Sequence, residues 1–158
     1  MAAGSKMCNA MKKFISRIMF CAMALFAFAA CSDPEAEKLE KVVGEWHYSG
    51  TESGVELDVY LALSSDYTFE LYQKIGEGPH YLYKGKFDYD GEVLSGTYND
   101  YTPWAHDYKV SRSGNSMTLT STTSTYSVTY TRKSIPEEVK THYMPVTKAE
   151  GGFEHPIL

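Results

Sequence analysis

Between Val42 and Lys133, apolar and polar residues alternate with a period of two, and this alternation constrains the fold more than any other feature. Residues 55–63 show it most clearly, because five aliphatic side chains fall at every second position. Successive side chains of a strand point to opposite faces, whereas a helix repeats every 3.6 residues, so the pattern predicts half-buried strands. The 13 tyrosines of the chain also favour β-structure.

The alternation predicts eight strands, which are separated by residues typical of turns. They span 42–49, 55–63, 67–75, 81–89, 93–98, 105–111, 115–121 and 125–133. The links after the second, fourth and sixth strands are tight, whereas longer links follow the first, third and fifth: Ser49–Gly54, Gly76–His80 and Asn99–Trp104. We therefore expect an all-β, up-and-down antiparallel barrel of eight strands, with tight turns at one end and long loops around the other.

Three residues at the ends of this pattern resemble the lipocalin family. Gly44 and Trp46 in the first expected strand resemble the Gly-x-Trp signature, and Arg132 lies where lipocalins place a basic residue across this tryptophan. Two further segments are similar to lipocalin-like bacterial lipoproteins: Leu94–Tyr98, and Ser65–Phe69, in which Tyr67 stands where a glycine is expected. The resemblance implies a lipocalin-like barrel with Gly44, Trp46 and Arg132 as its structural signature.

Residues 1–30 are expected to form a cleaved signal peptide, with Met11 as the true start. Basic residues precede an apolar run over 18–30, which is shorter than the roughly 20 residues that span a bilayer. The run ends in Phe28-Ala29-Ala30-Cys31, which resembles the lipobox of bacterial lipoproteins. The resemblance implies that Cys31 is acylated, for example with palmitate, and anchors the mature chain to a membrane.

Four segments follow from these features. They are a signal peptide over 1–30, a lipidated acidic tether over 31–41, the lipocalin-like barrel over 42–133 and a tail over 134–158. In the tail, Ser134 to Glu137 predicts a capping box that opens a short helix. We expect the chain beyond Pro145 to be extended or loose.

The expected mature chain is acidic, with 11 basic and 20 acidic residues and a formal charge of −9. Such a domain repels phosphate backbones, so we expect no nucleic-acid partner. The acidic tether is similar to a signal that exports lipoproteins to the surface of some Gram-negative bacteria. An outer-membrane lipoprotein, exposed at the cell surface, is the expected localisation.

No arrangement of residues predicts catalysis. The acidic residues of the strands, Glu56, Asp58, Glu70 and Asp88, all fall at outward positions, where they do not face one another across a cleft. No two of the five histidines have ligand spacing on one element, so we interpret them as scattered surface residues. We therefore expect no enzyme activity, metal or cofactor.

The long loops are the expected ligand-binding end. The candidate residues lie on or next to them: His80, Tyr98, Tyr101, Trp104 and His106. Trp104 either contacts a ligand or covers the barrel end as an apolar plug, and the inward tyrosines either line a pocket or fill the barrel. We expect a lipid-anchored binding or accessory module of the cell envelope, whose partner is a small molecule or a protein. The alternative is a structural or inhibitory protein–protein interaction module without a pocket.

Overall fold

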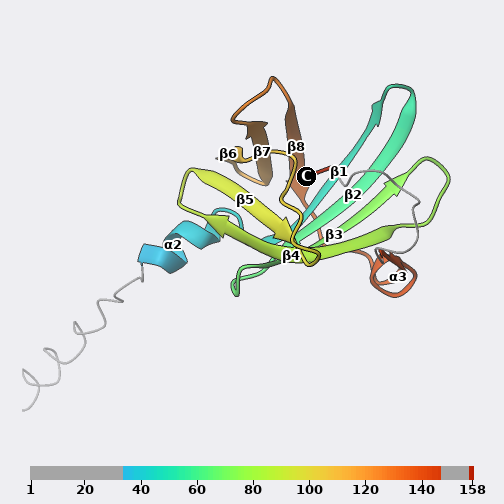
Figure 1. Cartoon of the computed structure of the whole chain (residues 1–158), viewed down its shortest axis with the longest axis horizontal. Helices are drawn as coiled ribbons and strands as arrows, with labels where there is room; N and C mark the ends of the chain where they lie inside the picture. Colours follow the sequence, from blue (N-terminus) through green and yellow to red (C-terminus); the bar gives the residue numbers. More distant parts are fainter. Residues whose placement is uncertain (1–33, 147–156) are drawn as a thin grey trace, which may run out of the picture. The chain divides into compact units, whose positions relative to one another are not determined.

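The computed structural model describes residues 34–146 and 157–158 (Figure 1). The expected signal peptide and the lipidation site at Cys31 lie outside the described residues. The strands are β1 Gly44–Glu52, β2 Val55–Leu63, β3 Thr68–Ile75, β4 Tyr81–Tyr89, β5 Val93–Tyr98, β6 Tyr108–Ser113, β7 Ser116–Ser121, β8 Ser127–Arg132 and β9 Met144–Pro145, with helices α2 Pro34–Glu40 and α3 Glu137–Thr141.

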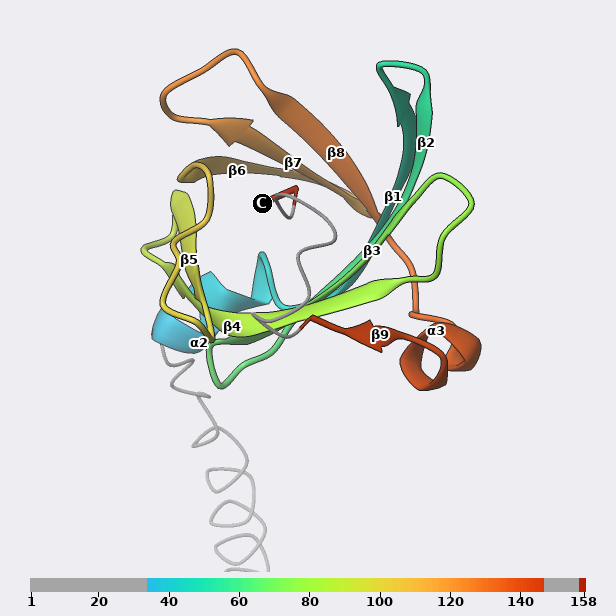
Figure 2. The ribbon, with the colours of Figure 1, turned by 45° about the vertical axis from the view of Figure 1, so that its right-hand side comes forward.

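The first eight strands form a closed antiparallel barrel. Each strand pairs with the next along the chain, and β1 pairs with β8, where Trp46 lies opposite Arg132. The short β9 adds to the outside of the barrel, parallel to the start of β4 (Figure 2). The predicted all-β, up-and-down barrel is therefore confirmed. Within the described ranges, no helix is long and apolar enough to cross a bilayer.

The links fall at two ends, which we call the sealed end and the mouth. The sealed end carries the β2–β3, β4–β5 and β6–β7 turns, and α2 lies against it, where Leu39 and Val42 join the core. The mouth carries the other links, including the nine residues 99–107 between β5 and β6. The expected long loop Ser49–Gly54 is wrong, because β1 and β2 pair as far as Glu52 and Val55 and only two residues separate them. Polar residues on both faces of this hairpin hide its alternation from sequence analysis.

The sixth strand begins at Tyr108 instead of residue 105, because the chain before it folds back over β5. The main-chain N–H of Trp104 donates to the Gly96 carbonyl oxygen at 2.9 Å, and Pro103 forms an isolated antiparallel β-bridge with Thr97. A Cβ on Gly96 would lie only 2.2 Å from the Trp104 ring, so this close approach requires glycine. His106 consequently precedes the strand and is half-buried.

The lipocalin-like signature lies at the sealed end. Trp46 is fully buried, and its indole N–H donates to the Val42 carbonyl oxygen at 2.8 Å. The Arg132 guanidinium lies 5.3 Å from the ring centroid, and the Arg112 guanidinium lies closer, at 4.4 Å. Two cations therefore pack on one indole, where the resemblance implied only Arg132.

A second apolar cluster covers the outside of β2, β3 and β4. It joins Tyr60, Tyr72 and Leu82 to two residues from the segment after β8, Ile135 and Val139. Helix α3 begins after Pro136 and has no side-chain cap, so the predicted capping box from Ser134 is wrong. The Ile135 N–H donates instead to the Glu45 carboxylate at 2.8 Å, and the same carboxylate accepts a bond from Lys140 at 2.7 Å.

Candidate ligand site at the barrel mouth

A pocket of about 530 Å³ lies at the mouth, beside the first residues of β4. It is lined by Leu82, Tyr83 and Lys84 of β4, by Tyr98 and the loop residues Asn99, Asp100, Thr102, Pro103 and Ala105, and by Tyr143, Pro145, Val146 and Leu158. Ligand pockets in proteins typically measure about 300–1,000 Å³. The pocket at the mouth lies within this range.

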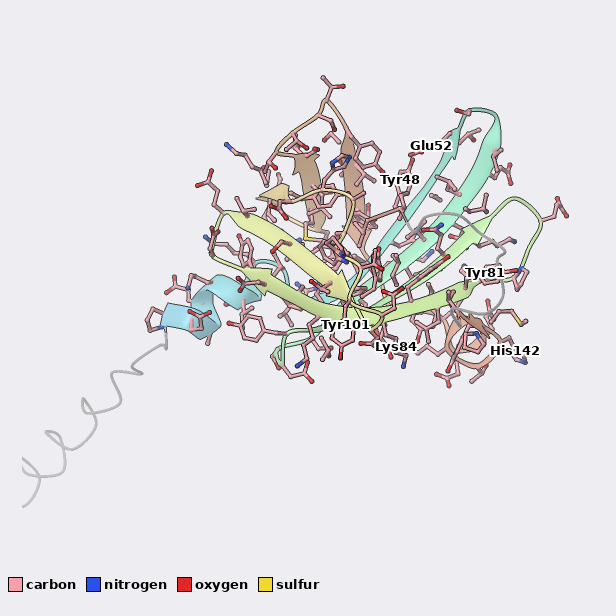
Figure 3. All side chains as sticks on the ribbon, in the orientation of Figure 1. Tyr48, Glu52, Tyr81, Lys84, Tyr101 and His142 are labelled. Carbon is pink, nitrogen blue, oxygen red and sulfur yellow. The ribbon has the colours of Figure 1, made fainter. Side chains whose placement is uncertain are left out.

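Main-chain hydrogen bonds hold the loop that forms one wall of the pocket. The Tyr98 N–H donates to the Thr102 carbonyl oxygen at 2.8 Å, and the Asn99 N–H donates to the Lys84 carbonyl oxygen at 2.9 Å. Tyr101 lies in this loop (Figure 3), and it is 90% exposed and in the left-handed region with φ 70°. Because this conformation is unfavourable for a residue with a side chain, the loop fixes an exposed aromatic ring at a cost.

The pocket has an apolar rim. Four large apolar residues are exposed among the residues that the structure describes. Val146 lines the pocket, and Tyr101 and Met144 are sequence neighbours of residues that line it, whereas Val55 lies outside the lining. Exposed apolar side chains that gather around one pocket are typical of a binding surface.

Two tyrosines bring hydroxyl groups to the pocket. The Tyr98 hydroxyl donates to the main-chain oxygen of Leu158 at 2.9 Å, whereas the Tyr83 hydroxyl has no hydrogen-bond partner among the described residues. Burial raises the pKa of both tyrosines above the ordinary value of 10.0. Both hydroxyls therefore keep their protons at neutral pH, and the Tyr98 hydroxyl uses its proton in the bond to Leu158.

Further polar atoms lie deeper in the barrel without partners in the described part of the chain. They are the indole N–H of Trp104 and the hydroxyls of Tyr108, Tyr126 and Tyr130. Burial raises the pKa of Tyr108 to about 12, so this hydroxyl is also protonated. An unmade hydrogen bond of a buried group costs about 1–3 kcal/mol, so this interior favours an occupant that brings polar atoms, such as water or a polar part of a ligand.

The five predicted site residues lie in four places. Tyr98 lines the pocket, and Tyr101 lies between two lining residues. Trp104 is only 5% exposed and packs against Phe69, with ring centroids 5.1 Å apart, so it lies in the core as the plug alternative expected. His106 packs near Tyr108 and does not line the pocket.

His80 belongs to a different cluster. Its Nε2 lies 3.1 Å from the Asp58 carboxylate, and Nε2 of His47 lies 2.7 Å from the other oxygen of the same group. Burial lowers the pKa of His80 more than the Asp58 charge raises it, so this imidazole is neutral at pH 7. The interpretation of scattered histidines is wrong for these two, although no group of three or more residues in the described ranges is arranged to hold a metal ion.

Sequence analysis missed two residues that bring order to the mouth. Gln73 is 3% exposed and faces inward from β3, where it accepts a hydrogen bond from the Ile157 N–H at 2.7 Å. A lone glutamine at an inward position of an apolar stripe is a signal that was available. Leu158 is 1% exposed and packs in the core, and Ile157 packs against the same core. The expectation of a loose tail is therefore wrong at Ile157 and Leu158. Residues 147–156 lie outside the described residues.

The fold and pocket define a closed eight-stranded β-barrel with a ligand-sized site at its mouth. Comparison of the chain with protein-family models, with curated proteins and with solved structures gives no match.

Proposed function

We propose that the chain is a lipid-anchored binding module of the cell envelope, with a lipocalin-like fold and no catalytic activity. The observation that carries the proposal is the pocket of about 530 Å³ at the mouth, with aromatic residues in its lining and apolar side chains at its rim. An apolar lining with a few fixed polar groups suits a ligand that is mainly apolar and carries one or two hydrogen-bonding atoms.

The proposed anchor is lipid on Cys31, in the outer membrane of a Gram-negative bacterium. The barrel is entered from α2 at the sealed end, where Lys38 lies beside Gly91 of the β4–β5 turn. A lipid attached ahead of α2 would hold the sealed end toward the bilayer and leave the mouth facing away from it. Acyl chains on one residue give firm membrane binding when two or more are present.

The anchor is tested by labelling with a palmitate analogue in a Gram-negative host. The unaltered chain should incorporate label and fractionate with the outer membrane, and Cys31→Ala should lose both properties. Cys21→Ala is the matched control, because this cysteine belongs to the expected signal peptide and should leave labelling unchanged. Label on the Cys31→Ala chain would contradict the proposed anchor.

The pocket is tested by titration with N-phenyl-1-naphthylamine, a neutral apolar dye whose fluorescence rises when it leaves water. We expect saturable binding at one site. Val146→Asp should weaken it about tenfold, because a carboxylate would enter the apolar lining. Val55→Asp is the matched control, because Val55 is 42% exposed and Val146 44%, but only Val146 lines the pocket. Absence of saturable binding, or equal effects of both changes, would contradict the proposal.

A protein ligand is the second candidate, and the exposed Tyr101 favours it. Tyrosine is enriched at the centres of protein interfaces because it offers a large contact area with few rotamers. Under this candidate function, Tyr101→Ala should abolish capture of an envelope protein while dye binding stays unchanged. If the same change weakens dye binding instead, Tyr101 serves the small-molecule site.

A further inference from the structure

The last two residues of the sequence occupy the mouth as a bound ligand would. After β9 runs along the outside of β4, residues 157 and 158 lie inside the ring of strands (Figure 2). Leu158 is 1% exposed and belongs to the core cluster, and Ile157 packs against the same cluster. The interior thus accepts at least one aliphatic side chain from a segment that belongs to no barrel strand.

The barrel recognises the main chain of these residues as well. Oε1 of Gln73 accepts a bond from the Ile157 N–H at 2.7 Å, and the Tyr98 hydroxyl donates to the Leu158 main-chain oxygen at 2.9 Å. The acceptor comes from β3 and the donor from β5, so two strands of the barrel contact one dipeptide. An N–H on one residue and an oxygen on the next are features of any peptide, whereas the buried side chains select an aliphatic one.

Gln73 is built into this site. Among the described residues, Gln73 and Ser121 are the two buried polar side chains, and a buried amide is costly unless it is hydrogen-bonded. An apolar residue at this inward position would fill the barrel without that cost. The Ile157 N–H supplies a donor to this buried amide oxygen at 2.7 Å.

The geometry points to a peptide-recognition site at the mouth: Gln73 and Tyr98 bind the main chain of a short aliphatic peptide, and Ile157–Leu158 competes with that peptide from within the same chain. This inference rests on the proposed binding function and names its ligand class. A tethered competitor acts at an effective concentration in the millimolar range, so an external peptide binds weakly until the tail is displaced.

The test uses the peptide N-acetyl-Ile-Leu-amide and the full chain. Leu158→Gly should bind this peptide at least about tenfold more tightly than the unaltered chain, as measured by calorimetry, because the competing side chain is gone. Leu158→Asp should do the same, because a carboxylate does not enter the core. A peptide methylated on the isoleucine nitrogen should bind about tenfold more weakly, because Gln73 then has no N–H to accept.

A second pair of variants separates recognition from general packing. In the Leu158→Gly chain, Tyr98→Phe should weaken peptide binding about tenfold, because the donor to the main-chain oxygen is lost. Tyr89→Phe is the matched control, because its hydroxyl also donates to a main-chain oxygen, that of Gly91 at the sealed end, and it should leave affinity unchanged within about twofold.

The outcomes distinguish this inference from the proposed function. If N-phenyl-1-naphthylamine binds to folded Leu158→Gly but the peptide does not, the peptide site is wrong and the binding module stands. Equal peptide affinity of the unaltered and Leu158→Gly chains would show that the tail is no competitor and overturn that part. If neither dye nor peptide binds, both proposals fail. If both Leu158 variants unfold, the tail is a structural part of the core and the inference is overturned.

Discussion

At the scale of single residues, Gly96 determines where Trp104 lies. The indole packs on the bare backbone of β5, at a distance where any side chain would overlap it. Gly96→Ala should therefore displace the ring and lower the free energy of unfolding by about 1–3 kcal/mol, the cost of overpacking a core. Urea unfolding measures the loss, and a red shift of tryptophan fluorescence should accompany it.

Gly78→Ala is the matched control for this change. Its nearest neighbour would be the Ile75 carbonyl oxygen at 3.6 Å, which is an ordinary contact, and its backbone is not in the left-handed region. The control should change stability by less than about 0.5 kcal/mol, as substitutions without a steric clash outside the core generally do. If Gly96→Ala were as stable as this control, Trp104 would not pack as described.

The two cations on Trp46 give a second residue-scale prediction. Arg112 lies nearer to the ring than Arg132, at 4.4 Å against 5.3 Å, so Arg112→Met should cost at least as much stability as Arg132→Met. A cation on an aromatic face contributes about 0.5–2 kcal/mol. Urea unfolding of both variants provides the comparison, with Lys109→Met as a control for loss of an exposed charge. If Arg112→Met left stability unchanged while Arg132→Met lowered it, the Arg112 side chain would not stabilise Trp46, and this prediction would be contradicted.

At the scale of elements, Glu45 ties the segment around α3 to the barrel. Burial raises the pKa of this carboxyl, but the hydrogen bonds from Lys140 and the Ile135 N–H lower it by more. The net pKa is therefore below the ordinary value of 4.5. The folded state therefore binds the proton less readily than the unfolded state. The stabilisation is present above about pH 4.5 and is lost as the pH falls through the lower folded value.

Glu45→Gln should lower stability at pH 7 and reduce the further loss between pH 5 and pH 3. The neutral amide does not titrate, and it gives up the charge-assisted bond to Lys140. Urea midpoints at several pH values measure both effects, and Glu77→Gln, in the exposed β3–β4 loop, is the control. An acid response that is the same with and without Glu45 would show that this carboxyl does not hold α3.

Sequence analysis predicts the elements well where one rule decides them. The period of two gives the bounds of β2, β4 and β5, because apolar side chains fall at every second position along the inner face of each strand. It fails at the β1–β2 hairpin, where Ser53 at φ 51° and Gly54 at φ 83° form a tight turn directly after residues 49–52, the end of β1, which has no apolar side chain on either face. It also predicts the start of the sixth strand at residue 105, whereas β6 begins at Tyr108. The chain before β6 folds back so that Trp104 packs on Gly96, and a local pattern does not contain this tertiary contact.

The candidate site is predicted only in part for the same reason. Tyr98 and the Asn99–Trp104 loop were predicted at the mouth from parity and loop length, and they line the pocket in part. Tyr67 was noted as an unexpected side chain, and its φ of 63° is a conformation that favours the glycine expected there. The contribution of the tail depends on contacts between residues 84 positions apart, such as Gln73 and Ile157, which no local pattern contains.

In the whole molecule, the segment after β8 contacts the barrel on its outside and on its inside. It leaves β8 at the sealed end, covers Tyr60 and Tyr72 on the outside and pairs with β4 at Tyr81. Leu158 then lies inside the mouth. The barrel therefore has an inner core and a smaller outer cluster, and both depend on the segment after Arg132. In the described part of the chain, these two layers and the loop over residues 99–107 meet at the mouth, beside the pocket of about 530 Å³.

Binding of a ligand at this mouth should change the amide chemical shifts of the isotope-labelled protein. On titration with N-phenyl-1-naphthylamine, we expect saturable shifts concentrated at Tyr83, Tyr98, Ala105 and Leu158. Shifts that concentrate instead around Gly91 at the sealed end, or that do not saturate, would contradict it.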